Sequence, residues 1–265
     1  MSTTYILKGT VMTHTRSVLE TLDLVKHFGG ITAVDHVSLS IRKGEIVGLV
    51  GRNGSGKTVL FNLISQFIFA DEGQVFLNGI NITGKKPWEV ARMGLMRSFQ
   101  EIRIFKGLST LENLLLAMAE PKQERLLSSI FNSRLSAKEK SGDIQKAYNL
   151  LERFGLAKTS CKLSGHLSRG QQQLLGVVCS IATGGNISLF DEPTAGLSEK
   201  SVHVFEKEII QLKRQGNGIL IIEHDMNLIR RICDQIVVIS KGAVFAVGKP
   251  VDVLSRPEIE MELLR

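Results

Sequence analysis

Eight consecutive residues, from Gly51 to Thr58, have the types and the spacing that a phosphate-binding loop requires. They read Gly-Arg-Asn-Gly-Ser-Gly-Lys-Thr, which matches the P-loop pattern G-x-x-x-x-G-K-[ST]. Its three glycines allow backbone conformations that other residues avoid, so that successive N–H groups can point at one phosphate. Lys57 would then reach the β- and γ-phosphates, and the Thr58 hydroxyl would ligate Mg²⁺. The predicted nucleotide contacts in this stretch are Gly51, Arg52, Asn53, Gly54, Ser55, Gly56, Lys57, Thr58 and Val59.

The elements on either side of the loop decide whether the pattern has this meaning. Residues 45–50 form an apolar run short enough for a buried strand. Residues 57–67 carry apolar side chains three and four positions apart, as a helix requires. Strand, glycine-rich turn and helix are the context that the motif needs. The alternative, an ordinary glycine-rich turn followed by Lys-Thr, is disfavoured because the pattern and both flanks match.

A pair of carboxylates follows a second apolar run. Residues 187–190 predict a buried strand, and Asp191 and Glu192 come directly after it. In P-loop enzymes the first carboxylate at this place holds Mg²⁺, usually through water. The next one can polarise the attacking water as a general base. Considered alone, the pair is explained equally well by a strand that ends in a polar turn. Together with a complete P-loop earlier in the chain, the pair predicts hydrolysis of a nucleotide.

The pattern of apolar residues predicts the elements that position these groups. Short apolar runs at 187–190, 218–222 and 235–239 are typical of parallel strands covered on both faces. Residues 17–28 and 34–41 predict strands of an antiparallel sheet, whereas residues 88–162 are mostly helical in character. We therefore expect an α/β fold with a P-loop NTPase core, an antiparallel β subdomain and an α-helical subdomain.

Composition limits the class of protein. The 265 residues are 43% hydrophobic and carry a net charge of +7, with no aromatic-interleaved basic stripe, so no nucleic-acid partner is predicted. No apolar run approaches the ~18 residues of a membrane span, and residues 1–20 lack the apolar core of a signal peptide. The spacing of Cys161, Cys179 and Cys233 is not that of metal ligands. We therefore expect the three cysteines to be small, buried hydrophobic residues of a protein in a reducing cytoplasm.

One further motif resembles a known family. Residues 167–171, Leu-Ser-Arg-Gly-Gln, resemble the L-S-G-G-Q signature of the ATP-binding subunits of ABC transporters, and they begin 24 residues before Asp191, as in that family. The resemblance implies that Ser168 and Gly170, with Gln171 in the same site, contact the γ-phosphate of an ATP held by the P-loop of a second subunit. A helix N-terminus there would suit the anion. Without the other motifs this stretch would predict only a helix N-cap.

The same resemblance assigns roles to three isolated residues. Gln100, in Arg-Ser-Phe-Gln, is similar to the family's Q-loop glutamine, which contacts Mg²⁺ and water. His224 resembles the switch histidine that contacts the γ-phosphate, and Phe28 resembles the aromatic residue that stacks on adenine. Taken alone, these would be a surface glutamine, a structural histidine and a core phenylalanine. The implied catalytic residues are Lys57, Gln100, Glu192 and His224, and the implied Mg²⁺ ligands are Thr58, Gln100 and Asp191.

The resemblance covers residues 18–265, and the stretches 28–34, 91–100 and 222–226 resemble the branched-chain amino acid importer branch. It implies an ABC ATP-binding domain over residues 19–265, with a helical subdomain at about 101–175, after an N-terminal extension of residues 1–18. The implied function is ATP hydrolysis that drives import of branched-chain amino acids. The implied partners are integral membrane permeases, a second ABC ATPase subunit in a homo- or heterodimer and, indirectly, a solute-binding protein, at the cytoplasmic face of the membrane.

Several alternatives stay open. The same branch includes importers of urea and amides. A non-transport ABC ATPase acting on nucleic acid or ribosomes usually has two cassettes or a long coiled-coil insert, and neither is present. Arg169 replaces the first signature glycine, Ser198 replaces a usual Asp or Asn, and Gly176 is expected to interrupt the helix after the signature. These departures keep open a catalytically weakened ATP-binding partner in a heterodimer.

Overall fold

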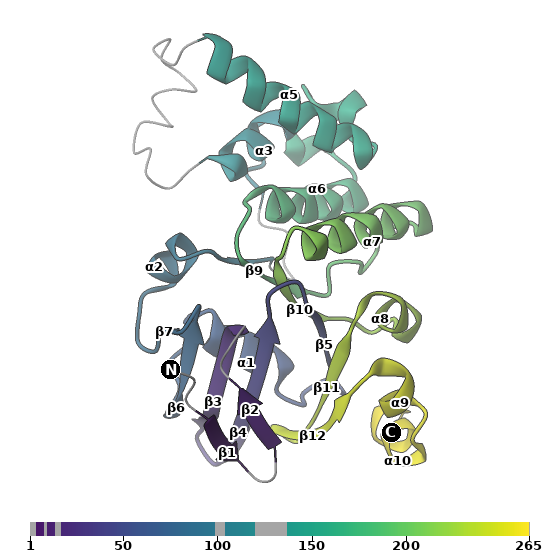
Figure 1. Cartoon of the computed structure of the whole chain (residues 1–265). Helices are drawn as coiled ribbons and strands as arrows, with labels where there is room; N and C mark the ends of the chain where they lie inside the picture. The colour runs from purple at the N-terminus through teal and green to yellow at the C-terminus, as the bar shows by residue number, and fades with distance from the viewer. Residues whose placement is uncertain (1–3, 8–9, 14–16, 99–103, 120–136, 265) are drawn as a thin grey trace. The chain divides into compact units, whose positions relative to one another are not determined.

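The computed structural model describes residues 4–7, 10–13, 17–98, 104–119 and 137–264 (Figure 1). The chain divides into two compact units, each described here by itself. The first unit comprises Met1–Leu95, Asn186–Phe190 and Ile210–Arg265, and the second comprises Met96–Gly185 and Asp191–Ile209.

A mixed sheet forms the centre of the first unit. Its parallel strands are β5 (Ile46–Val50), β10 (Gly218–Ile222) and β11 (Gln235–Ser240), and β12 (Ala243–Gly248) pairs antiparallel with β11. With β9 (Ile187–Asp191) and β8 (Leu95–Arg97) the order is β12-β11-β5-β10-β9-β8. All residues of β5 and β10 are buried, which explains their continuous apolar runs. The predicted strands at 187–190, 218–222 and 235–239 are confirmed. The three-residue strand β8 lies within residues 88–162, the stretch predicted to be mostly helical, and the sequence pattern did not indicate it.

An antiparallel sheet of order β4-β3-β6-β7 also belongs to the first unit. Its strands are β3 (Ser17–Phe28), β4 (Ile31–Arg42), β6 (Glu72–Leu77) and β7 (Ile80–Asn81). The two strands predicted at 17–28 and 34–41 are confirmed, and β4 extends further at both ends. In the N-terminal segment, β1 (Thr4–Leu7) pairs antiparallel with β2 (Thr10–Thr13).

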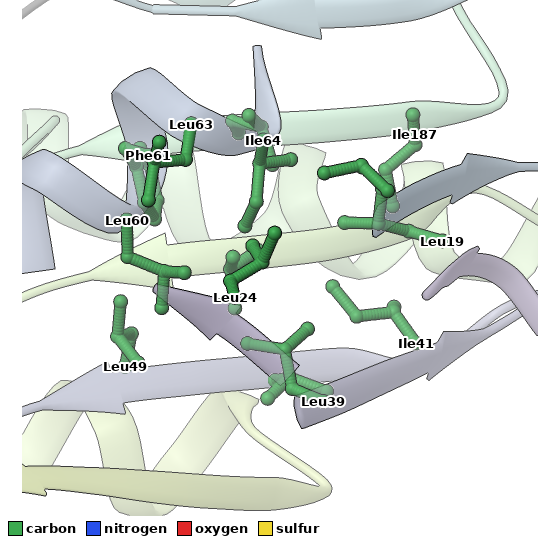
Figure 2. Packing of buried hydrophobic residues seen from close by; sticks show 14 of the residues in the cluster. Leu19, Leu24, Leu39, Ile41, Leu49, Leu60, Phe61, Leu63, Ile64 and Ile187 are labelled. Carbon is green, nitrogen blue, oxygen red and sulfur yellow. The ribbon is translucent and has the colours of Figure 1, made fainter. Parts of the chain in front are cut away.

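Helix α1 (Lys57–Ile64) packs with strands of both sheets, as Figure 2 shows. Its Phe61 and Ile64 are fully buried in a cluster that includes Leu24 of β3, Ile41 of β4 and Leu49 of β5. The apolar side chains of α1, three and four positions apart, therefore face the core as the sequence predicts. Because α1 starts at the P-loop, this packing fixes the loop against the core of the first unit. The other helices of this unit are α2 (Pro87–Arg92), α8 (Met226–Ile232), α9 (Pro250–Leu254) and α10 (Pro257–Leu264).

The second unit is helical. It contains α3 (Thr110–Met118), α5 (Ala137–Arg153), α6 (Arg169–Ala182) and most of α7 (Glu199–Arg214), with 3₁₀ turns at Ala157–Thr159 and Ser164–His166. Helix α3 packs on α5 and α6. Arg153 Nη1 donates to both carboxylate oxygens of Glu208, at 2.7 and 2.9 Å, and so joins α5 to α7. Helix α6 runs through Gly176 without a break, so the expected interruption there is wrong.

Two expectations from composition can be compared with the structure. Among the residues described, no helix combines the length and the apolar character needed to cross a bilayer. Cys233 is buried and Cys179 is partly buried, but Cys161 is exposed, so the expectation that all three are buried is wrong for Cys161. Burial raises the pKa of the Cys179 thiol to about 12.

Candidate nucleotide site

The predicted phosphate-binding loop connects the end of β5 at Val50 to the start of α1 at Lys57. Gly56 is the N-cap residue of α1, with φ of 104°, and within this described segment no side chain caps the helix and its first turn has no acidic residue. The first N–H groups of a helix have no partner within the helix, and its dipole favours an anion. The start of α1 is therefore suited to bind phosphate.

Close backbone contacts explain two of the loop glycines. A Cβ atom on Gly56 would lie 2.3 Å from the carbonyl oxygen of Ala33, in addition to the strain of its positive φ. A Cβ atom on Gly51 would lie 2.3 Å from the carbonyl oxygen of Ile239 in β11. Gly51 is not among the glycines with a positive φ, so the requirement for glycine here is explained by the close approach of the backbone. Gly54 does have a positive φ, of 79°.

Lys57 is buried in the loop, with 6% of its surface exposed. Its ammonium donates to the carbonyl oxygen of Gly51 at 2.6 Å and to that of Arg52 at 2.8 Å. The Ser55 hydroxyl is buried and makes no hydrogen bond within the described part of the chain. A buried hydroxyl of this kind fits a ligand oxygen, because buried polar atoms are normally paired. Thr58 is exposed at the first turn of α1, whereas Val59 is half-buried against the core.

His224 lies at the same edge of the mixed sheet as the loop. In the parallel pairing of β10 with β5, Ile222 is opposite Leu49, so both chains leave their strands at this edge. The backbone N–H of His224 donates to Glu223 Oε2 at 3.2 Å, and its side chain is exposed. Asp225 caps α8 by accepting from Asn227 N at 2.8 Å. The histidine is thus held between a buried strand and a capped helix.

Phe28 lies at the tip of the hairpin formed by β3 and β4. It pairs with Ile31 across the turn made by Gly29 and Gly30. Its side chain is 49% exposed, so it is not the core residue that composition alone would suggest. The Lys26 ammonium lies 5.7 Å from the centroid of its ring. The tip therefore presents an aromatic surface to solvent.

The two predicted carboxylates belong to the second unit. Asp191 is 2% exposed, its backbone N–H donates to Ser98 Oγ at 3.1 Å, and its Oδ2 lies 3.8 Å from Arg97 Nη2. Glu192 follows with φ of 48°, a conformation that residues other than glycine rarely adopt. Such strained backbone is concentrated at functional sites. Reasoning from sequence missed the contact of Arg97 with Asp191, because a single arginine beside the Gln100 motif carries no pattern.

The signature stretch starts α6. The Ser168 hydroxyl accepts from Gln171 N at 3.3 Å, and Gln171 Oε1 accepts from Ser168 N at 3.1 Å, which together form a capping box. The expectation that these residues cap a helix is confirmed. The position of a Cβ on Gly170 is 3.7 Å from the carbonyl oxygen of Gly196. Arg169 is exposed in the first turn of α6.

The structure places the predicted residues in two groups. The loop, His224 and Phe28 lie in the first unit, whereas Asp191, Glu192 and the signature lie in the second. Gln100 lies outside the described residues. Among the described side chains, no group of three or more His, Cys, Asp or Glu residues could hold a metal by itself. The Thr58 hydroxyl and the Asp191 carboxylate are each of the oxygen-donor type that Mg²⁺ prefers, and Mg²⁺ takes few protein ligands beside phosphate and water.

Comparison with known families gives a consistent result. The sequence pattern of the family described as ABC transporter matches residues 34–195. A probable branched-chain amino acid transport ATP-binding protein of Archaeoglobus fulgidus is 36% identical over 242 residues, which are 91% of this chain and 93% of that protein. A high-affinity branched-chain amino acid transport ATP-binding protein of Salmonella typhimurium is 35% identical over 237 residues, 89% of this chain and 93% of that one.

Solved structures show the same fold. An ATP-binding cassette of an ABC transporter in its ADP conformation has a TM-score of 0.77 and 33% identity, and the match covers 94% of this chain and 99% of that one. A dimeric ATP-binding cassette in a post-hydrolysis state, bound to ADP and Pi, has a TM-score of 0.71 and 25% identity. That match covers 88% of this chain and 98% of the other. The predicted α/β fold with a P-loop NTPase core is confirmed.

Proposed function

The chain belongs to the ABC transporter family, and from that premise we propose that it hydrolyses ATP to drive import of branched-chain amino acids. The substrate assignment depends on the sequence identity to the two relatives, which is about one third over about nine-tenths of each chain. Both relatives are named for the transport of branched-chain amino acids. The ATP-binding fold alone cannot name a transported solute. The amino-acid assignment therefore depends on these relatives.

The loop geometry supports a role for Lys57 in binding the β- and γ-phosphates. Its ammonium is held by two loop carbonyls, so it is already desolvated next to the start of α1. On binding ATP it would exchange those carbonyls for phosphate oxygens, which are stronger acceptors because they are charged. The N–H groups at the start of α1 and the buried Ser55 hydroxyl would complete the cradle. Phe28 would stack on the adenine ring.

In the proposed hydrolysis, Glu192 orients the attacking water and accepts its proton, and His224 donates a hydrogen bond to the γ-phosphate. The strained backbone of Glu192 supports a functional position, because such strain persists only where the surroundings enforce it. Thr58, Asp191 and Gln100 would hold Mg²⁺, which would neutralise charge on the phosphates. Arg97, whose Nη2 lies 3.8 Å from Asp191 Oδ2, would hold that carboxylate in its orientation.

The proposed partners are integral membrane permeases and a second ABC ATPase subunit, identical or not. Each ATP would lie between the P-loop of one subunit and the signature of the other, where the start of α6 would face the γ-phosphate. The complex would sit at the cytoplasmic face of the membrane and receive solute from a solute-binding protein. No nucleic-acid partner is proposed.

Reconstitution tests this function. The chain would be expressed with its candidate permeases, purified through a tag on this subunit, and placed in liposomes that enclose ATP, with the solute-binding protein outside. Uptake of labelled leucine is expected, and Glu192→Gln should abolish it while the complex still assembles. Uptake of urea or an amide without leucine would overturn the amino-acid assignment. Failure to recover any integral membrane partner would overturn the transport role.

A second candidate, a catalytically weakened partner in a heterodimer, is favoured by Arg169. This cation is exposed in the first turn of α6, where the family signature has glycine. Replacing the catalytic glutamate by glutamine in one subunit and then in the other distinguishes the two candidates. Equal losses of ATPase rate would argue for two equivalent sites, whereas unequal losses would identify the weaker one.

A further inference from the structure

The tip of the β3–β4 hairpin extends beyond the rest of its sheet. On its other side β3 pairs with β6, but this pairing ends at Val25 opposite Glu72. The three residues that follow in β3, Lys26 to Phe28, pair only with β4 among the described strands. A two-stranded ribbon is weakly ordered by itself in water. Further contacts are therefore needed to hold Phe28 in one place.

Asp71, the residue before β6, supplies these contacts. Its backbone N–H donates to the carbonyl oxygen of Val25 at 2.9 Å. Its Oδ2 accepts from the backbone N–H of His27 at 2.7 Å, and its Oδ1 accepts from Lys26 Nζ at 2.7 Å. The Asp71 carboxylate thus contacts two further residues of β3, Lys26 and His27, beyond the last pair of β3 with β6. These two residues directly precede Phe28.

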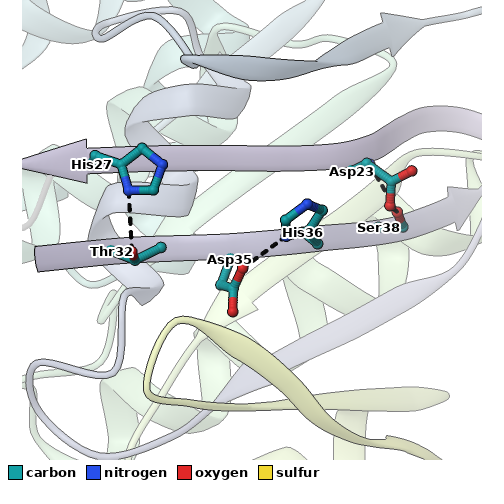
Figure 3. Close-up of polar contacts among 6 residues, drawn as sticks. All are labelled: Asp23, His27, Thr32, Asp35, His36 and Ser38. Carbon is teal, nitrogen blue, oxygen red and sulfur yellow. Dashed lines mark hydrogen bonds and ion pairs between the residues drawn. The ribbon is translucent and has the colours of Figure 1, made fainter.

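The opposite strand holds His27 as well. Figure 3 shows the hydrogen bond between His27 Nδ1 and Thr32 Oγ1 across the hairpin, at 3.1 Å. His27 is therefore fixed through its backbone by Asp71 and through its ring by Thr32. Rotation of the tip about the axis of β3 would break both bonds.

The ion pair also fixes a cation beside the aromatic ring. Lys26 Nζ, bound to Asp71, lies 5.7 Å from the centroid of Phe28. The Lys26 side chain is 17% exposed and that of Asp71 is 38% exposed, so the pair lies at the surface of the hairpin. The His27 N–H, followed by the Lys26 ammonium, lowers the pKa of Asp71 below its usual value. The carboxylate is therefore ionised at neutral pH.

We propose that Asp71 is a positioning residue for adenine binding: by holding Lys26 and the backbone of His27, it fixes the orientation of the Phe28 ring. The proposal rests on the proposed adenine contact of Phe28. Stacking requires a ring that is already oriented, because a mobile ring must be ordered on binding at a cost in entropy. A carboxylate 43 positions from Phe28 in the sequence would then control affinity for the base without touching the nucleotide.

Measurements of ligand binding to the full-length chain distinguish a positioning role of Asp71 from a general structural role. Calorimetry would compare ADP with inorganic tripolyphosphate, which has the phosphates but no base, for Asp71→Ala, Asp71→Asn and Phe28→Ala. The control is Asp35→Ala, which removes an exposed carboxylate of β4 that contacts His36 at 2.7 Å (Figure 3). Melting temperatures would show that each variant is folded. In the assembled transporter, KM and kcat for ATP would be measured with the same variants.

Phe28→Ala is expected to weaken ADP binding ~2- to 10-fold, the range of an aromatic stacking contact, and to leave tripolyphosphate binding unchanged. Asp71→Ala should cause a loss of similar size, restricted to ADP, with KM raised and kcat unchanged. Asp71→Asn should be intermediate, because its single amide oxygen can still accept the His27 N–H, whereas both the acceptor and the charge toward Lys26 are lost. The double variant should bind ADP no more weakly than Phe28→Ala.

The possible failures separate the two proposals. If Phe28→Ala weakens ADP binding and neither Asp71 variant does, the positioning role is refuted and the adenine contact stands. If Phe28→Ala has no effect, the adenine contact is refuted and the positioning role with it. An equal loss of tripolyphosphate binding in Asp71→Asn would also refute positioning, because Asp71 would then support the loop as a whole.

Discussion

Replacing Asn113 with alanine should destabilise the second unit by about 3 kcal/mol. The side chain is 4% exposed, and its Oδ1 accepts from the backbone N–H of Phe105 at 2.8 Å. Its Nδ2 lies 2.9 Å from Ser109 O, 3.1 Å from Phe105 O and 3.1 Å from Ser164 Oγ. An amide nitrogen has two hydrogens, so about three hydrogen bonds are lost, at ~1 kcal/mol each.

The isosteric change Asn113→Asp separates hydrogen bonding from packing. It keeps the shape and the acceptor for Phe105 N–H, but it places a carboxylate oxygen against the carbonyl oxygens of Phe105 and Ser109. We therefore expect it to destabilise the unit at least as much as alanine does. The control Asn149→Ala removes an exposed side chain of α5 that accepts from Gln145 at 2.8 Å, and it should change stability by less than ~0.5 kcal/mol.

Urea unfolding followed by circular dichroism and by hydrogen exchange measures these effects. Peptides covering residues 104–118 should exchange faster in Asn113→Ala, since Phe105 N–H loses its acceptor. The single tryptophan, Trp88, belongs to the first unit, so its fluorescence serves as an internal reference. An alanine variant within ~0.5 kcal/mol of the parent protein, or aspartate tolerated better than alanine, would refute the reasoning.

Three other predictions concern single side chains. Lys57→Met should weaken ATP binding at least ~10-fold in calorimetry, because each hydrogen bond to a charged group contributes ~1.5–3 kcal/mol. Iodoacetamide near neutral pH should label Cys161 and spare Cys179 in peptide mass mapping, since Cys161 is exposed and burial raises the pKa of the Cys179 thiol to about 12. Lowering the pH from about 6 to about 3 should destabilise the second unit more in the parent protein than in Glu112→Gln, as measured by urea unfolding. Hydrogen bonds from Ser109 lower the pKa of Glu112, so its stabilising contribution is complete above its unfolded-state pKa and is lost as the pH falls through its folded-state pKa.

Each of these predictions has a result that contradicts it. Lys43→Met, at an exposed lysine outside the loop, is the control for Lys57, and equal ATP affinities in the two variants would contradict the phosphate contact. Alkylation of Cys179 in the folded protein would contradict its burial. The same dependence of stability on pH with and without Glu112 would show that its capping contact does not stabilise α3.

The parts of the fold that depend on local sequence could be predicted. The strand, loop and helix around Lys57 follow from an eight-residue pattern and from apolar periodicity on both sides. The strands at 187–190, 218–222 and 235–239 are buried on both faces, so each reads as a continuous apolar run. Strand β8 gave no such signal, because its three residues are too few to show a period.

Contacts between distant residues could not be predicted. Asp71 holds Lys26 across 45 positions, and Arg97 meets Asp191 across 94. Neither pair shows a pattern in one sequence, because a single charged residue near a turn is usually solvated. The close approach of Gly51 to Ile239 is likewise set by the pairing of β5 with β11, which only the folded chain reveals. Local motifs thus identified the groups that can do chemistry, and tertiary pairing determines how they are held.

The start of α6 shows that a structural and a functional role can coincide in one side chain. The Ser168 hydroxyl accepts a hydrogen bond from Gln171 N, so it caps the helix, as its residue type alone suggests. A hydroxyl also has one hydrogen to donate, and accepting the Gln171 N–H leaves that hydrogen available. Gln171 in turn accepts from Ser168 N, so the two residues fix each other in place. The cap therefore does not compete with the proposed contact to a partner's nucleotide: it orients the oxygen that would donate to the phosphate.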